Sequence, residues 1–201
     1  TKEIKHLILE KIVFQSVQEF LNIEKILKTI KTMVWINFIR RKYDFYQKIK
    51  NQINGRELSI YYNSSDWGMG CNAIHFIDLL SFITNESTLN IDLSGLEKKI
   101  YNSKRDGYVE FKGEMVANTK KGDSLTVIDK KNNFSDQPLV ISFSEIKYEI
   151  YEDLNRVSFF NGENKKELKV NFPYLSQLSA EIVDEIIKKD SSQLTPYSEM
   201  M

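Results

Sequence analysis

His75 is the side chain in this sequence best suited to acid–base chemistry, because of where it lies in a predicted helix. The pattern predicts a helix over 71–84, directly after a polar loop that ends in Trp67-Gly-Met-Gly70. A histidine one turn into such a helix can reach a cleft at the helix N-terminus, where the helix dipole favours neutral imidazole. Neutral imidazole is the form that a general base needs. A core histidine hydrogen-bonded to the backbone is the alternative, and spacing alone leaves both open.

Two further side chains lie on the same helical stripe as His75. Cys71 precedes it by four residues and Asp78 follows it by three, so the three side chains share one face. A zinc site built from them would need a fourth ligand or a water molecule, and the only other histidine in the sequence is His6. We therefore expect no metal site, and we expect Asp78 to be structural.

Gly68 and Gly70 raise a competing interpretation. The segment Gly68–Ala73 matches G-x-G-x-x-A, the looser form of the dinucleotide-binding fingerprint, and Asp92 follows at the distance expected of a ribose-binding acid. In such a site the first glycine follows a buried strand at once, whereas polar residues 63–67 intervene here. This spacing argues against a self-contained dinucleotide site, which would predict saturable binding by this chain alone.

Cationic residues follow two predicted apolar strands near the N-terminus. Lys11 comes just after the strand predicted at 6–9, and Arg40 and Arg41 follow the one predicted at 33–39. Residues at the carboxyl ends of strands point into the crevice where open α/β sheets bind ligands. There Lys11 could orient a substrate hydroxyl, and Arg41 could bind a carboxylate or phosphate. Taken alone, Lys11 is better explained as a surface lysine in a loop, and ordinary charges at the start of a helix explain Arg40 and Arg41 at least as well.

The remaining patterns predict a chain of two parts. Ser16 and Glu19 form a capping box that opens a helix, so the first 40 residues follow the order strand, helix, strand. Helices are also predicted near 42–53 and 174–188, and alternating residues over 108–160 predict a mainly antiparallel sheet. We expect an α/β (α+β) fold with one domain over 1–40 and another over 41–201. One face of the second sheet could pair with a second copy.

Composition excludes several classes of protein. The 201 residues are 41% hydrophobic and 12% aromatic, which is enough to build a core. The 28 basic residues balance the 28 acidic ones, so we expect no nucleic-acid partner. The single cysteine excludes a disulfide within the chain, and neither a signal peptide nor a membrane span is evident. We therefore expect a cytoplasmic protein.

Taken in order, four segments resemble the later two-thirds of the glucose-fructose oxidoreductase, inositol dehydrogenase and rhizopine catabolism family. Residues 6–12 resemble the Glu-Lys-Pro strand of the family's Rossmann domain, and residues 34–41 resemble the last strand of that domain. Residues 67–80 resemble the helix that carries the catalytic histidine, especially in members from surface-polysaccharide and acyl-sugar pathways. Residues 194–199 resemble the segment before the family's final helix.

The resemblance implies the end of a Rossmann domain, then a mixed sheet domain with helices on one face. It also implies an oxidoreductase that uses NAD or NADP and acts on a sugar or sugar derivative. His75 would exchange the proton of the reacting hydroxyl, and Lys11 would stabilise charge on the same oxygen. Further contacts are implied for Glu10 and Lys11 to the cofactor, and for Arg41, Tyr43 and Asn72 to the substrate.

Three departures from the family pattern qualify these expectations. Ile12 stands in place of the usual proline, and Cys71 stands where many members have aspartate one turn before the histidine. The sequence also begins just before the Glu-Lys strand, so the strands that carry the family's glycine loop are missing from it. We therefore expect no cofactor binding by this chain alone. The alternative function is a non-catalytic sugar-binding or oligomerisation module.

Overall fold

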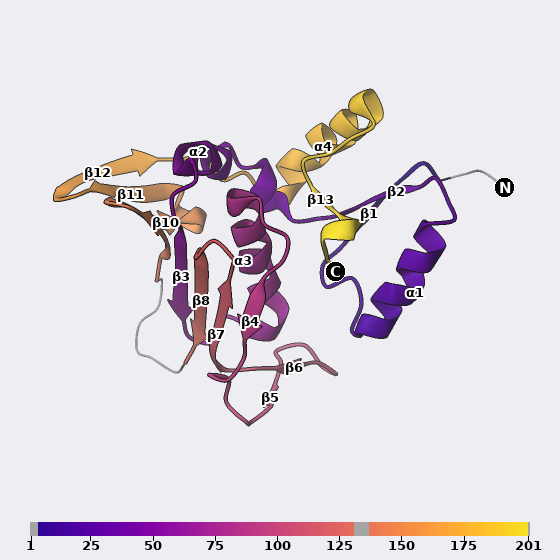
Figure 1. The fold of residues 1–201 in the computed structure, drawn as a ribbon, viewed down its shortest axis with the longest axis horizontal. Coiled ribbons are helices and arrows are strands. Elements are labelled where there is room, and N and C mark those ends of the chain that lie inside the picture. The colour runs from indigo at the N-terminus through magenta and orange to yellow at the C-terminus, as the bar shows by residue number, and fades with distance from the viewer. Residues whose placement is uncertain (1–3, 131–136, 201) are drawn as a thin grey trace. The chain divides into compact units, whose positions relative to one another are not determined.

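The computed structural model describes residues 4–130 and 137–200, which fall into two compact units (Figure 1). Thr1–Tyr43 and Pro173–Met201 form the first unit, and Asp44–Phe172 form the second. The predicted boundary near residue 40 lies close to the first division. The C-terminal segment departs from the predicted second domain, because the chain returns to the first unit and pairs with its sheet.

The first unit contains the predicted strand, helix and strand. Strands β1 (His6–Leu9) and β2 (Met33–Ile36) are parallel, and helix α1 (Val17–Leu27) connects them. Ser16 caps α1 by accepting a hydrogen bond from the backbone N–H of Glu19, as the capping box predicts. The remaining elements are η1 (Ile39–Lys42), α4 (Leu175–Lys189), β13 (Thr195–Pro196) and η3 (Tyr197–Met200), of which β13 pairs antiparallel with β2.

The second unit is built on a mixed sheet of eight strands in the order β12-β11-β10-β9-β3-β8-β7-β4. Every neighbouring pair is antiparallel except β3 and β8, which are parallel, so the predicted mixed and mainly antiparallel sheet is confirmed. Its strands are β3 (Ser59–Ser64), β4 (Asn90–Asp92), β7 (Gly113–Asn118), β8 (Ser124–Asp129), β9 (Leu139–Phe143), β10 (Ile146–Tyr151), β11 (Arg156–Asn161) and β12 (Asn164–Lys169). The turn η2 (Glu152–Leu154) precedes β11, and β5 (Tyr101–Asn102) and β6 (Val109–Glu110) form a separate hairpin.

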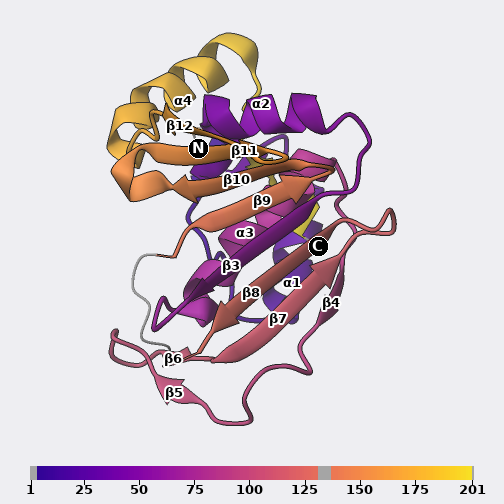
Figure 2. The same cartoon turned by 90° about the vertical axis from the view of Figure 1, so that its left-hand side faces the viewer.

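Two helices cover one face of this sheet. Helix α3 (Met69–Thr84) lies behind the sheet in Figure 2, and α2 (Asp44–Ile53) packs beside it. Side chains of β7, β8 and β9 alternate between buried and partly exposed, because successive residues of a strand point to opposite faces. The partly exposed face could receive a second copy of the chain, which stays a prediction.

No helix in the described part of the chain combines the length and the apolar character needed to cross a membrane.

Candidate functional site

The carboxyl ends of β1 and β2 bring Glu10 and Asn37 together. Because the two strands are parallel, the residues that follow them lie at one edge of the sheet. The Asn37 side-chain amide donates to Glu10 Oε1 at 2.6 Å, and the Asn37 backbone N–H donates to the carbonyl oxygen of Leu9 at 2.9 Å. Asn37 is 8% exposed, and its Oδ1 has no hydrogen-bond partner among the described residues. A buried acceptor of this kind suits a donor from a ligand.

Asn37 is a candidate that the sequence interpretation missed. Its signal was a polar residue within the apolar run Met33–Ile39, in a segment predicted to be strand throughout. In the structure β2 ends at Ile36, so Asn37 is the first residue after the strand and belongs to the ligand-binding edge.

The predicted cationic residues lie near the same strands. Lys11 is half-buried directly after Glu10, and the peptide bond between Lys11 and Ile12 is cis. Arg41 is buried in η1 and donates to the carboxylate of Glu199 at 2.8 Å. Tyr43 is also buried, at the end of the first unit. The Arg41 guanidinium thus already binds a carboxylate of its own chain, and its contact with substrate stays a prediction.

In the second unit, the N-terminus of α3 is occupied by a carboxylate from a distant segment. The helix begins after Gly68, which is left-handed at φ 75°, and the side-chain amide of Asn72 donates to the Trp67 carbonyl at 2.8 Å. The Gly70 N–H donates to Glu110 Oε2 at 2.8 Å, and a Cβ at Gly70 would lie 2.9 Å from that oxygen. The glycine loop therefore seats Glu110 where a dinucleotide site would hold phosphate, which argues against the competing interpretation.

His75 lies one helical turn beyond Asn72 on α3 and is half-buried. The core is reached instead by Ala73, Phe76 and Leu79, which are all buried. His75 is therefore not sealed in the core. The acid–base hypothesis requires a histidine that is at least partly exposed. Cys71 is half-buried and Asp78 is buried on the same helix. Among residues 4–130 and 137–200, no group of three or more His, Cys, Asp or Glu side chains is placed to hold a metal ion.

A cavity of about 230 Å³, with several charged side chains in its lining, lies at the N-terminus of α3. Asp129 belongs to its lining, is 2% exposed, and accepts the Asp66 backbone N–H at 2.9 Å through its carboxylate. Burial raises the pKa of the Asp129 carboxyl, while Lys112 forms an ion pair with the Asp66 side chain. Its lining includes Trp67, Asn72, Tyr101, Glu110, Lys112 and Asp129. Among these residues the sequence interpretation had named Asn72 as a substrate contact.

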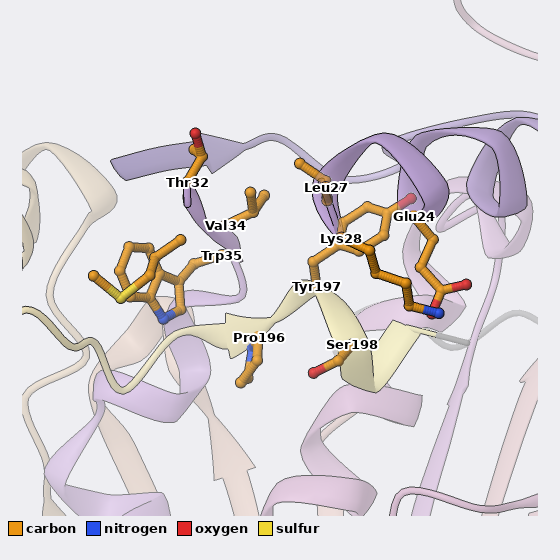
Figure 3. A pocket seen from close by; sticks show the side chains of 10 residues that line it. Glu24, Leu27, Lys28, Thr32, Val34, Trp35, Pro196, Tyr197 and Ser198 are labelled. Atoms are coloured by element: carbon orange, nitrogen blue, oxygen red, sulfur yellow. The ribbon is translucent and has the colours of Figure 1, made fainter. Parts of the chain in front are cut away.

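A larger and more apolar cavity of about 390 Å³ lies in the first unit (Figure 3). Its walls include Trp35 of β2 and Tyr197 of η3. Glu24 of α1 and Lys28, which directly follows α1, form an ion pair of 2.7 Å within its lining. It reaches Thr32 and Met33, at the opposite end of β2 from Asn37. None of the predicted site residues lines it, and the ligand edge of a parallel sheet lies at the other end.

Comparison with solved structures identifies proteins of the same fold. An oxidoreductase from Thermotoga maritima superposes with a TM-score of 0.67 and 11% identity, over 96% of this chain and 64% of that chain. An inositol dehydrogenase homologue complexed with NAD+ from Azotobacter vinelandii gives 0.58 and 13%, over 82% and 50%. A super-repressor mutant of Gal80p from Saccharomyces cerevisiae gives 0.61 and 14%, over 93% and 60%.

No protein-family model matches the sequence, and no curated protein matches it. The chain spans between half and about two-thirds of the length of the three solved structures. These likenesses support the resemblance drawn from residues 6–12, 34–41 and 67–80. The chain therefore has the fold of part of these solved structures, among them an oxidoreductase and an inositol dehydrogenase homologue.

Proposed function

We propose that this chain is part of a nicotinamide-dependent oxidoreductase that acts on a sugar or sugar derivative. The observation that carries the proposal is the half-buried His75 on α3, one turn beyond the loop at Trp67–Gly70. The fold gives further support, because it is shared with a dehydrogenase homologue complexed with NAD+.

In this proposal the residues of this chain manage the proton and the charge of the reacting hydroxyl. His75 in its neutral form accepts the hydroxyl proton during oxidation and returns it during reduction. The Lys11 ammonium donates a hydrogen bond to the same oxygen and stabilises its developing negative charge. Arg41, Tyr43 and Asn72 are proposed as substrate contacts.

The cofactor fits the described residues in part. Asn37 Oδ1 and Glu10 offer acceptors at the carboxyl edge of the parallel strands, and Glu10 and Lys11 are the residues proposed to face a nicotinamide cofactor. A glycine loop at a helix N-terminus, which would bind the cofactor phosphates, is not evident. The sequence contains no glycine before Gly55, and Glu110 already occupies the N-terminus of α3. We therefore propose that this chain by itself does not bind NAD or NADP with useful affinity. Micromolar binding measured by calorimetry on the chain alone would contradict this.

The function is tested by His75→Ala in the protein that contains this chain, with reduction of NAD or NADP followed on a panel of neutral sugars and inositol. Turnover should fall by roughly 10²- to 10⁴-fold, while affinity for the cofactor changes little. His6→Ala is the matched control, because His6 is the other histidine and its ring pairs with Asp190 at 3.1 Å. Equal turnover in the two variants would remove His75 from catalysis.

A non-catalytic sugar-binding or assembly module is the second candidate. Cys71 in place of the family's usual aspartate favours it, and so does the fold shared with a Gal80p super-repressor mutant. This candidate predicts sugar binding with no reduction of either nicotinamide cofactor, and His75→Ala would leave that binding unchanged.

A further inference from the structure

We propose that the hairpin of β5 and β6 binds the surface of an anionic lipid bilayer. The hairpin belongs to the second unit, and Figure 2 shows it at the opposite end of this unit from α2. Such binding requires no membrane-spanning segment, because exposed apolar side chains beside basic ones attach a protein to the lipid–water interface. The proposal does not depend on the proposed function.

Residues 97–109 concentrate positive charge in a chain whose formal net charge is zero. They contain four basic side chains and two acidic ones. The four basic side chains are all exposed, and they are Lys98, Lys99, Lys104 and Arg105. Lys112 is paired with Asp66, whereas the described residues offer these four no ion-pair partner. Each such cation next to an anionic lipid surface strengthens binding by about fivefold.

Large apolar side chains are exposed beside these cations. Ile100 is 62% exposed, Val109 is 52% exposed and Tyr108 is 42% exposed. Successive residues of a strand point to opposite faces, so Val109 lies on the other face of the hairpin from Glu110. Because the Glu110 carboxylate contacts the start of α3, Val109 faces away from that helix. The hairpin therefore presents apolar groups that can enter the interfacial region of a bilayer.

Hydrogen bonds hold the hairpin in this conformation. At its base, Glu110 Oε2 accepts the Gly70 backbone N–H at 2.8 Å. Toward its tip, the Ser103 backbone N–H donates to the carbonyl oxygen of Tyr108 at 3.1 Å. Because both ends are held, little conformational entropy is lost when the hairpin binds a surface.

The combination of charge and apolar exposure favours a lipid surface over a soluble polyanion. A soluble polyanion would pair with the cations but would leave Ile100 and Val109 in water. An uncharged bilayer would accept the apolar side chains but would offer the cations no anionic partner. An anionic bilayer satisfies both groups at once.

Sedimentation with lipid vesicles tests the proposal directly. The full chain is mixed with vesicles of phosphatidylcholine alone and with vesicles that also contain phosphatidylglycerol. We expect binding to the anionic vesicles only, and we expect high salt to weaken it, because salt screens the attraction between exposed charges. Heparin is the soluble polyanion used for comparison.

Two pairs of adjacent lysines provide matched variants. Lys98→Gln combined with Lys99→Gln removes two charges from the hairpin and should weaken binding about thirtyfold. Lys165→Gln combined with Lys166→Gln removes the same charge from β12, where both lysines are exposed, and should change binding only slightly. Ile100→Ser leaves the charge unchanged and should weaken binding about five- to tenfold, because it removes exposed apolar surface.

Three exposed glycines locate the contact. Gly107 lies in the turn of the hairpin, while Gly55 and Gly162 lie in other turns, and none has a heavy atom within 4 Å of an added Cβ. The full chain, labelled with ¹⁵N, is added to anionic nanodiscs that carry a nitroxide on a lipid headgroup. The amide NMR signal of Gly107 should broaden strongly, and the signals of Gly55 and Gly162 should persist.

Each outcome decides the proposal. Equal binding to both kinds of vesicle would overturn it, and so would equal losses in the two lysine pairs, unchanged binding of Ile100→Ser, or equal broadening of the three glycines. Binding of heparin without binding to vesicles would assign the hairpin to a soluble polyanion and would also overturn it. None of these measurements requires cofactor or turnover, so they leave the proposed function to its own test.

Discussion

Replacing Asp123 with alanine should destabilise the second unit more than replacing any exposed acidic residue. Asp123 is 4% exposed in the turn before β8, and its Oδ1 accepts the Leu58 backbone N–H at 2.9 Å. Its Oδ2 accepts the hydroxyl of Thr119 at 2.7 Å. Because Leu58 directly precedes β3, this carboxylate fixes the start of the strand that leads to the loop containing Trp67.

The magnitude follows from the groups left behind. In Asp123→Ala the N–H of Leu58, a residue that is 2% exposed, loses its acceptor. An unsatisfied buried donor costs about 1–3 kcal/mol, and the lost hydrogen bond of the Thr119 hydroxyl adds about 1 kcal/mol. The free energy of unfolding should therefore fall by about 2–4 kcal/mol. Asp123→Asn keeps one acceptor oxygen and should lose less.

Urea unfolding followed by circular dichroism measures this difference. Asp92→Ala is the matched control, because Asp92 is exposed at the end of β4, where it accepts the Ser94 N–H at 2.8 Å, and its replacement should cost about 0.5 kcal/mol. A loss in Asp123→Ala no greater than in Asp92→Ala would refute the assigned role of the buried carboxylate. In the NMR spectrum, Asp123→Ala should also move the indole signal of Trp67 and spare that of Trp35.

Two further predictions concern stability. Burial raises the pKa of Asp129, so between the ordinary and the raised value the folded state keeps a proton that the unfolded chain has released. As pH rises through that window, the wild-type protein should lose stability relative to Asp129→Asn. Urea unfolding midpoints of the two proteins at several pH values measure this change. A difference in midpoint that does not depend on pH would contradict the prediction. Gly113→Ala should cost about 3 kcal/mol or more, because φ is 115° and a Cβ would lie 2.4 Å from the Gly95 carbonyl oxygen. Gly107→Ala is the control, because Gly107 also has a positive φ of 80° but no heavy atom lies within 4 Å of the added Cβ, and it should cost about 1 kcal/mol. Equal losses of stability for the two variants in thermal unfolding would show that the close contact at Gly113 is unimportant.

Part of the candidate site could be predicted from local sequence patterns. The helix that carries Asn72 and His75 was expected from apolar periodicity after a glycine loop, and α3 occupies that place. Lys11 follows a short strand because an apolar run ends at Glu10, although Leu7 and Ile8 of that strand are exposed and not buried as the apolar run suggests. Such features depend on residues within one or two turns of each other, which sequence periodicity reports directly.

The parts that could not be predicted depend on distant segments. Glu110 reaches Gly70 across forty residues, and β13 returns to β2 from the far end of the chain. The parallel pairing of β3 with β8 could not be predicted either. Alternation of apolar and polar residues shows that a strand exists, but not which strand lies beside it.

The sequence by itself thus determined the elements and the position of His75 and Lys11 along them. Only the tertiary structure decided that a carboxylate fills the α3 N-terminus and that Asn37 Oδ1 is buried without a partner among the described residues. The physical reason is that helices and strands follow from local periodicity. A cavity and the hydrogen bonds of its lining follow from which remote side chains the packed sheet brings together.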